Sequence, residues 1–584
     1  MPALTTKAPA LSRWSPPYRI GIIIVLALLV TAPALVWREI PERDYANYAL
    51  MTDEFARGNY TRAFHPHVPP LLITLGGGLA HLVSDPYRAN RLASILLFLL
   101  GIPGTFWLVR ELQDERIADI ATVLYAICPQ TVYLATSGGL DAGKLGLLPW
   151  LTWAGLRWYR HGGAPWGIAV GVLGALVGLA RGEGIFFAIA VLGWYLFETA
   201  RQGGYRFGVL RRSLTGLIGA MLGLMLGLLP WLLYQRSQTG LWITHPTQLG
   251  IYAWFGVQHQ WPLQTIIDDN SMEAPGAPAS ATPAMVSSDK PATSEDQPPL
   301  SISRPPPTVP PSESVDMRDN RKNIPWFKNI EKVAKGASIP FLILAVGGTI
   351  WAKRRGMALG RHGGSLPLIL AALNLAIFYP TNIMAARYVS ATIPLFLHLS
   401  SLGVLACQEV CQRRPFFTAG RMRLATGIGV VTLALLSQGQ LDIFMKPHKR
   451  SEQLALMRLG TWIRQHAHEF PDYGVLPNLS SYHNGKVPIL LETDGRLRYY
   501  ARTDGLVLYS FYRYTPSQIT AICRQGKVGV IAYDERMEAL CPGFGQYWRR
   551  EPAYVPVDLG PELSDLPAGA PVLLCFRADH RALP

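Results

Sequence analysis

Charged side chains are scarce in this sequence. Asp, Glu, Lys and Arg make up only 16% of its 584 residues, whereas hydrophobic residues make up 49%. A soluble protein normally carries about 25% charged residues, so the composition excludes an ordinary soluble enzyme and favours a chain that crosses a membrane repeatedly. Lys and Arg outnumber Asp and Glu by 54 to 39. They are spread over several loops rather than gathered in one patch, which disfavours nucleic acid as a partner.

Cysteine and cleavable targeting signals are sparse as well. The six cysteines show no metal-binding spacing, and the three nearest the C-terminal end would leave one over if two formed a disulfide. The first apolar stretch follows basic residues, but no small-residue cleavage site and soluble mature chain come after it. We therefore expect this stretch to remain as a membrane anchor.

Hydrophobic runs, by contrast, are abundant. A spanning helix needs roughly 20 apolar residues. We expect about eleven spans, at 18–37, 91–109, 117–136, 144–160, 164–180, 184–197, 213–235, 337–352, 364–380, 386–406 and 422–440. The apolar stretch 68–83 is rich in Pro and Gly, and we expect it to lie partly embedded or at the interface rather than to span.

The basic loops set the orientation of these spans. With a cytoplasmic N-terminus, the loops 157–163, 198–212, 353–362 and 407–423 face the cytoplasm, and each is rich in Lys and Arg. The sequence thus predicts a polytopic α-helical membrane protein whose first outer loop, 38–72, carries surface helices. A small soluble α/β domain is expected to follow outside the cytoplasm.

Four regions divide the chain. Residues 1–267 form the N-terminal membrane bundle, and residues 325–440 form the second membrane section. Between them, 268–324 is rich in Pro and Ser with almost no branched apolar residues, so we expect a disordered outer loop. Residues 441–584 mix helix and strand patterns. In this last region we expect a helix over 451–468, a helix start at Thr515–Pro516, and strands at 487–492, 506–512, 528–533 and 571–577.

The few ionisable residues near membrane depth all fall on the side away from the cytoplasm. Such residues are costly to keep and are candidates for function. They are Asp44, His65, His67, Asp141, Lys144, Arg181, Glu183 and Arg387. Because they converge on one face, we expect a single active site that looks out of the cell.

Six of these residues also have a simpler reading. Asp44 begins a helical pattern that Gly58 would end, so it is also a plausible N-cap. Asp141 and Lys144 fit a local pair at a helix start. Arg181 and Glu183 fit a turn salt bridge. Arg387 fits snorkelling to lipid head groups. Because all of these residues are expected on the same side of the membrane, a common functional site is favoured over separate structural roles.

In order and topology, the sequence resembles the bacterial members of the GT-C superfamily of membrane glycosyltransferases. The branch is that of protein O-mannosyltransferases and lipid A aminoarabinose transferases. The resemblance covers roughly residues 1–440. It rests on Asp44 with the Tyr-rich helical pattern that follows it, and on Asp141 at the mouth of a span. It also rests on the segments HPHVPPLL, GLARGEG and ARYVSATIPLF. It implies an inverting, polyprenyl-phosphate-dependent hexosyl or pentosyl transferase, metal-independent or metal-assisted.

The resemblance also implies roles for three residues. Asp44 matches the first-loop catalytic base, Asp141 the second-loop acid, and Arg387 a phosphate-binding position. The branch often has an Asp-Glu pair at the first position, whereas Tyr45 follows Asp44 here. The base therefore has one acidic neighbour fewer.

The chemistry expected outside the cytoplasm agrees with this assignment. No nucleotide-sugar pool exists there, so an activated sugar arrives on a lipid carrier whose phosphate needs cations. We expect Lys144, Arg181 and Arg387 to bind the donor phosphate, and one carboxylate to take the proton of the acceptor. Expected substrate contacts are His65, His67, Tyr45, Tyr48 and Glu183. His65 and His67 lack an obvious third ligand, so no metal site is assigned, although a divalent cation stays open.

Lipid, glycan and protein acceptors all stay open, as does contact with membrane lipids. A competing interpretation is an enzyme like an O-antigen ligase or polymerase, with an Arg/His-centred site. Another is a transporter of lipid-linked sugars, which would normally show repeated halves with broken helices near the midplane. We expect a multi-pass protein of the bacterial cytoplasmic (inner) membrane, with the active site and C-terminal domain outside the cytoplasm.

Overall fold

The structure is a computed structural model. It describes residues 15–37, 41, 43–66, 68–201, 207–245, 333, 336–357, 364–378, 386–412, 427, 429, 447–466, 489–493, 496–501, 503, 505–507, 514–525, 528–567 and 570–577. The expected disordered loop at 268–324 lies outside the described residues, as do His67 and all but two residues of the expected span 422–440.

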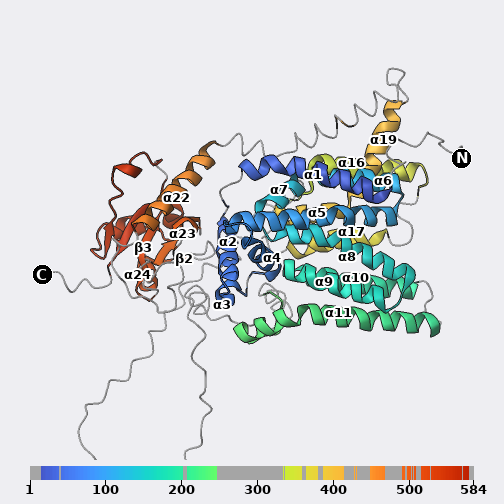
Figure 1. Ribbon diagram of the computed structural model, residues 1–584, viewed down its shortest axis with the longest axis horizontal. Coiled ribbons are helices and arrows are strands. Elements are labelled where there is room, and N and C mark those ends of the chain that lie inside the picture. Colours follow the sequence, from blue (N-terminus) through green and yellow to red (C-terminus); the bar gives the residue numbers. More distant parts are fainter. Residues whose placement is uncertain are drawn as a thin grey trace, which may run out of the picture.

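Long helices packed side by side form the larger part of the molecule (Figure 1). Each of the other ten expected spans coincides with one helix or with helices in close succession. These helices are α1 (Pro16–Trp37), α5 (Pro86–Leu112), α6 (Glu115–Ile127), α7 (Pro129–Ser137), α8 (Asp141–His161), α9 (Ala164–Ala180), α10 (Gly184–Arg201), α11 (Phe207–Thr239), α16 (Ile339–Arg354), α17 (Ser365–Phe378), α18 (Ala386–Ser390) and α19 (Leu397–Gln412).

Among the described residues, four helices are long and apolar enough to cross a membrane. They lie in α1, α5, α10 and α11. Helices α6 and α7 meet at a bend of 52° and together would make a fifth. Several other apolar helices are shorter, so the expected total of about eleven spans stays a prediction.

Two of the expected spans are interrupted where proline removes a backbone donor. Pro129 begins α7 directly after the bend at Cys128. The expected continuous span 386–406 is wrong in detail, because it is divided into α18, a 3₁₀ turn (Ile393–Leu395) and α19. Pro394 sits in that turn and cannot donate the N–H that a continuous helix needs. The break leaves α18 as a short helix of five residues.

Glycines let helices α9 and α11 approach closely. A Cβ at Gly167 would lie 2.0 Å from the carbonyl oxygen of Gly216, and one at Gly171 would lie 2.1 Å from that of Ala220. Helices α16 and α19 meet in the same way at Gly348 and Gly403. Small residues at helix crossings are typical of membrane bundles, where packing rather than the hydrophobic effect drives association.

Three short helices lie across one end of this bundle (Figure 1): α2 (Arg43–Ala56), α3 (Tyr60–Ala63) and α4 (Pro70–Ala80). Helix α2 follows the expected pattern and ends before Gly58, which has a φ of 80°. Asp44 lies in the first turn of α2 rather than before it. Helix α4 has 11 residues, too few to span a membrane, as expected for this apolar segment.

The C-terminal part is a mixed sheet with helices on both faces. The strands β1 (Ile489–Glu492), β2 (Gly505–Val507), β3 (Val528–Tyr533), β4 (Tyr554–Pro556) and β5 (Val572–Phe576) lie in the order β2-β1-β3-β5-β4. Strands β1, β2 and β3 are parallel, and β5 is antiparallel to β3 and β4. The expected strands are confirmed where they are described, and β4 is additional.

Successive side chains of a strand point to opposite faces of the sheet, and each face packs against its own set of helices. Leu490, Val530 and Leu573 pack with α22 (Pro447–Gln465) and α23 (Arg496–Ala501). The next residues, Leu491, Ile531 and Leu574, pack on the other face with α24 (Pro516–Gln525), α25 (Glu535–Leu540) and α26 (Phe544–Trp548). Thr515 and Gln518 cap the start of α24 reciprocally, with N···O distances of 2.8 and 3.3 Å. All six cysteines are free thiols.

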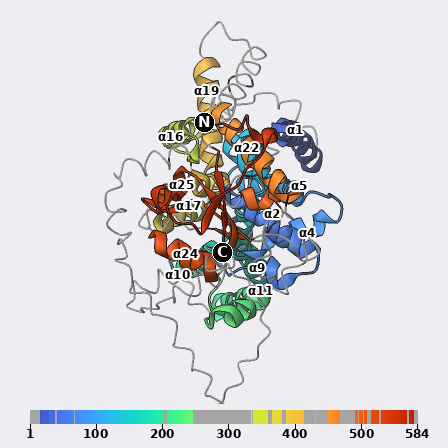
Figure 2. The same cartoon turned by 90° about the vertical axis from the view of Figure 1, so that its left-hand side faces the viewer.

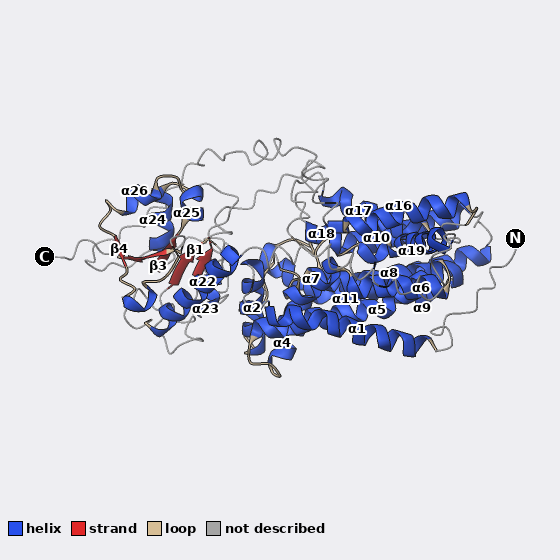
Figure 3. Ribbon diagram, turned by 90° about the horizontal axis from the view of Figure 1, so that it is seen from above, coloured by secondary structure: helices blue, strands red, loops and turns tan. Residues whose placement is uncertain are grey.

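The sheet domain meets this same end of the bundle through α23 and α2 (Figures 1 and 3), and Figure 2 shows the molecule with the sheet domain toward the viewer. Arg498 Nη2 donates to Asn47 Oδ1 at 2.8 Å. Tyr499 is buried in one cluster with Tyr45 and Tyr87. The α/β part therefore lies directly against the helix that carries Asp44.

Candidate active site

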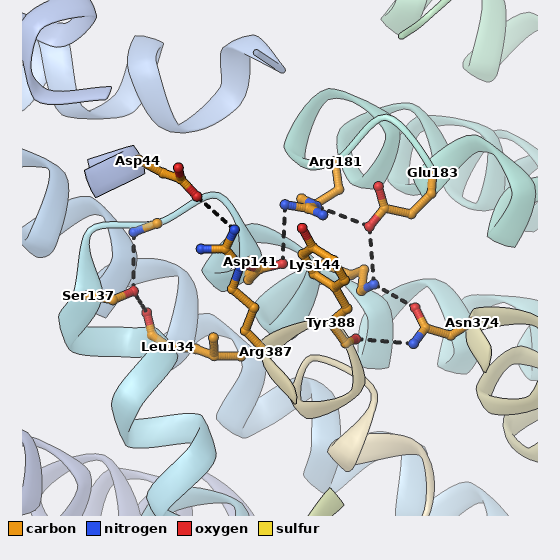
Figure 4. Close-up of polar contacts among 11 residues, drawn as sticks. Asp44, Leu134, Ser137, Asp141, Lys144, Arg181, Glu183, Asn374, Arg387 and Tyr388 are labelled. Atoms are coloured by element: carbon orange, nitrogen blue, oxygen red, sulfur yellow. Dashed lines mark hydrogen bonds and ion pairs between the residues drawn. The ribbon is translucent and has the colours of Figure 1, made fainter. Parts of the chain in front are cut away.

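The fold brings Asp44 of α2 and Arg387 of α18 into contact across most of the chain. Arg387 Nη2 donates to Asp44 Oδ2 at 2.7 Å, although the residues are 343 positions apart (Figure 4). Both side chains keep an exposed fraction, 27% for Arg387 and 41% for Asp44. Asp44 therefore neither caps its own helix nor stands alone, and Arg387 reaches a protein carboxylate rather than only the lipid surface.

Asp141 lies behind this pair and faces two arginines. Its Oδ1 lies 3.4 Å from Arg181 Nη1, and its Oδ2 lies 3.8 Å from Arg387 Nε. The Asp141 side chain is only 3% exposed. Arg181 continues the chain through Nε to Glu183 Oε1 at 3.0 Å, which is the turn salt bridge that the sequence allowed.

Lys144 is the most deeply buried of the linked side chains. Its side chain has no exposed surface, and Nζ lies 3.3 Å from Glu183 Oε1. Nζ also donates to Asn374 Oδ1 at 2.7 Å, and Asn374 Nδ2 donates to the carbonyl of Tyr388 at 3.1 Å. Helix α17 thereby joins the site through a residue of an otherwise apolar segment (Figure 4).

The ring of Tyr388 lies beside both arginines. The guanidinium carbon is 4.8 Å from the ring centroid for Arg181 and 5.4 Å for Arg387. Such contacts stabilise a cation that has lost part of its water. The two arginines are therefore held on one side by carboxylates and on the other by an aromatic face.

Glycines allow the loops of the site to pack this closely. A Cβ at Gly184 would lie 2.2 Å from the carbonyl oxygen of Val177, so the turn that carries Arg181 and Glu183 can fold back onto α9. Gly138 ends α7 with a φ of 73°. A Cβ at Gly139 would lie 2.6 Å from the ring of Tyr45. Gly139 thus makes room for α2, and Gly138 lies against Tyr87 and Arg91 of α5.

The aromatic and histidine residues expected at the site are placed around it. Tyr48 lies within electrostatic reach of Asp44 and both arginines, and burial together with Asp44 raises the pKa of its phenol well above the ordinary value. Tyr45 is packed in the cluster of α2 with Tyr87 and Tyr499. The segment after α3 is fastened to α11, where Gln235 Nε2 donates to the Pro66 carbonyl at 2.8 Å.

The pKa values of His65 and Glu183 are both lowered, and the shifts indicate their protonation states at neutral pH. Burial, and then the neighbouring His245, lower the pKa of His65 to about 4, so this imidazole is neutral. Burial acts to raise the pKa of Glu183, but Arg181 and Lys144 outweigh it and lower the pKa to about 2. Glu183 is therefore an anion at any physiological pH.

The formal charges of the linked side chains cancel. Asp44, Asp141 and Glu183 supply three carboxylates, and Lys144, Arg181 and Arg387 supply three cations. Within the described part of the chain, no group of three His, Cys, Asp or Glu side chains is placed to hold a metal ion.

Six of the eight ionisable residues singled out in the sequence lie in this connected chain, and His65 lies on the loop beside α11. Two contributors, Asn374 and Tyr388, were not predicted. An Asn inside an apolar run was the signal for Asn374, because a polar side chain in a spanning segment calls for a partner. Tyr388 adjoins Arg387, but nothing in the sequence shows that its ring faces Arg181.

The protein has short helices laid over one end of its helical bundle, with a cluster of carboxylates and arginines beside them. It resembles the GT-C superfamily of membrane glycosyltransferases, as the sequence predicted. A family model described as dolichyl-phosphate-mannose-protein mannosyltransferase matches residues 65–234, which include Asp141, Lys144, Arg181 and Glu183.

Two solved structures show the likeness over nearly the whole fold. ArnT from Cupriavidus metallidurans, bound to undecaprenyl phosphate, superposes with a TM-score of 0.56 and 14% identity, over 97% of this chain and 99% of that chain. The apo oligosaccharyltransferase of Archaeoglobus fulgidus gives 0.51 and 13%, over 92% and 71%. These matches establish the fold. Comparison with curated protein sequences gives no significant match.

Proposed function

We propose that the protein is an inverting glycosyltransferase that moves a sugar from a polyprenyl-phosphate donor to an acceptor at the extracytoplasmic face of a bacterial inner membrane. The observation that carries this proposal is the connected chain from Asp44 to Lys144 at one end of the bundle. A carboxylate next to partly exposed cations is what such a transfer needs. The GT-C likeness of the fold supports the same reaction.

Asp44 is the proposed base. The acceptor hydroxyl oxygen attacks the anomeric carbon of the sugar while the bond from that carbon to the phosphate oxygen breaks. The hydroxyl proton passes to the Asp44 carboxylate, and the electron pair of the broken bond leaves on the polyprenyl phosphate. One displacement inverts the configuration at the anomeric carbon. Asp44 is the most exposed of the three carboxylates, so it is the one that an acceptor can reach.

Arg387 and Arg181 are the proposed partners of the donor phosphate. Arg387 is held by Asp44 in this state, and its side chain is partly exposed. Since the cluster has no surplus positive charge, the phosphate takes Arg387 from Asp44. That exchange leaves Asp44 unpaired and able to accept a proton. Donor binding would therefore activate the base, and Asp141 would keep both guanidinium groups in place.

The neighbouring groups complete the proposed substrate site. Tyr48 is a neutral phenol beside Asp44, and His65 is a neutral imidazole on the loop fastened to α11. Both can hydrogen-bond sugar hydroxyls without adding charge. The α/β domain lies against α2, the helix that carries Asp44, so we place this domain beside the acceptor. We leave lipid, glycan and protein as acceptor classes.

Transfer of radiolabelled sugar tests this function. Membranes that contain wild-type protein should move label from a polyprenyl-phosphate donor to an acceptor, and membranes with Asp44→Asn should lose transfer by about 100-fold or more. The matched control is Asp53→Asn, on the same helix, whose carboxylate pairs locally with Arg57 at 3.0 Å. Equal transfer by wild type and Asp44→Asn would remove Asp44 from the mechanism and favour the ligase-like alternative.

A further inference from the structure

Asn374 occupies an unusual place in the bundle. It lies on α17 with no exposed surface, in the middle of the apolar sequence LAALNLAIF. A buried amide is costly unless its donor and acceptor are both used. Here its oxygen accepts from Lys144 Nζ and its nitrogen donates to the Tyr388 carbonyl, at 2.7 and 3.1 Å. One side chain thus connects α8, α17 and α18.

Two paths lead from Asn374 to the two arginines. On one side, Lys144 contacts Glu183 Oε1, and the same oxygen accepts from Arg181 Nε. On the other side, Tyr388 follows Arg387 directly in α18, and its ring lies against both guanidinium groups. Asn374 is therefore connected to Arg181 through Lys144 and Glu183, and to Arg387 through Tyr388.

Lys144 itself cannot easily meet a donor phosphate in this arrangement. Its side chain is fully buried, and it lies 5.3 Å from the centroid of the Phe187 ring. Moving the ammonium group outward would leave Glu183 and Asn374 without this cation. The geometry is that of a group which holds its neighbours rather than one which binds a ligand.

We propose that Asn374 and Lys144 are positioning residues that fix Arg181 and Arg387 at the spacing needed to bind the donor phosphate. The inference rests on the proposed function and replaces the phosphate contact expected of Lys144. Neither residue touches the reacting atoms. Removing the side chain of Asn374 or Lys144 should weaken phosphate binding. Arg181 and Arg387 would then be mobile before the phosphate arrives, and ordering them would cost part of the binding free energy.

Direct binding of undecaprenyl phosphate to the purified full-length protein in detergent is the test. This readout needs no transfer, so it separates a positioning role from a defect in chemistry. Asn374→Leu and Lys144→Met should each weaken binding by about tenfold, and the double variant should lose little more, because both act through one contact. The matched control is Thr152→Val, a buried position on α8 whose hydroxyl only meets its own helix at Leu148, and it should bind like wild type.

The outcomes divide cleanly. If Asn374→Leu and Lys144→Met bind like wild type, or if their losses multiply in the double variant, the positioning role is overturned and the proposed function stands. If wild type itself does not bind undecaprenyl phosphate, both are overturned. Should Asn374→Leu fail to fold, Asn374→Asp decides: it keeps an oxygen for Lys144 and loses the donor to Tyr388, and wild-type affinity for that variant would overturn the role.

Discussion

Glu183 uses one oxygen, Oε1, to meet both Lys144 and Arg181, at 3.3 and 3.0 Å. Lys144 is fully buried, and Glu183 is only 12% exposed. Removing one partner from a buried ion pair leaves the other charge without compensation, which costs about 3–5 kcal/mol. The stability of the site therefore depends more on Glu183 than a turn salt bridge at the surface would suggest.

Replacing Glu183 with Gln should lower the free energy of unfolding by about 3 kcal/mol, because the buried Lys144 loses its carboxylate partner and Arg181 keeps only Asp141. The pKa of Glu183 is lowered from 4.5 to about 2, so its contribution is fully present above about pH 4.5. The difference between wild type and the variant should be constant from pH 5 to 8 and shrink as the pH falls toward 2. Thermal unfolding in detergent across this range is the measurement. A difference that widens in acid would contradict the assigned direction.

Helices α9 and α11 show what the fold requires of a whole element. Their backbones approach at Gly167 and Gly171, where no side chain fits between a helix and the carbonyl oxygens of its neighbour. The sequence predicts the positions of both helices, because each is a long run of apolar residues. It does not pair them, because glycines are frequent in many spanning segments.

Gly171→Ala should destabilise the bundle by about 1–3 kcal/mol, the usual cost of overpacking, because its Cβ would lie 2.1 Å from the Ala220 oxygen. Gly193→Ala, in the interior of α10, is the matched control, since nothing lies within 4 Å of the added Cβ. That change should be neutral or slightly stabilising. Thermal unfolding of the two variants side by side provides the comparison. Equal melting temperatures would show that α9 and α11 do not pack this way.

At the scale of the whole molecule, the α/β domain packs against one end of the helical bundle, and helix α2 lies at the contact. The sequence predicted where most of the apolar helices lie, that the charged residues come together, and the mixed character of the C-terminal part. It did not predict which charges pair, because Asp44 and Arg387 are 343 positions apart and only packing decides their contact. Nor did it predict the break at Pro394 or the inward turn of Lys144, since helix rotation depends on neighbours far along the chain.

Contact between the domains should matter for transfer. Arg498 and Tyr499 meet α2 at Asn47 and Tyr45, one turn or less from Asp44. Arg498→Ala combined with Tyr499→Ala should lower the rate of transfer by about tenfold, because the base loses its fixed position. The control is Arg458→Ala, which breaks a pair with Asp565 inside the α/β domain. Transfer rates in membranes, normalised to protein level, are the readout, and an unchanged rate would separate the domain from the chemistry.

The configuration of the product tests the central claim most directly. A polyprenyl-phosphate sugar of known anomeric configuration is incubated with purified wild-type protein and an acceptor, and the anomeric proton of the product is followed by NMR. A single displacement assisted by Asp44 predicts a product of the opposite configuration, formed by wild type and not by Asp44→Asn. A product of retained configuration, or one formed equally by Asp44→Asn, would contradict the proposed mechanism.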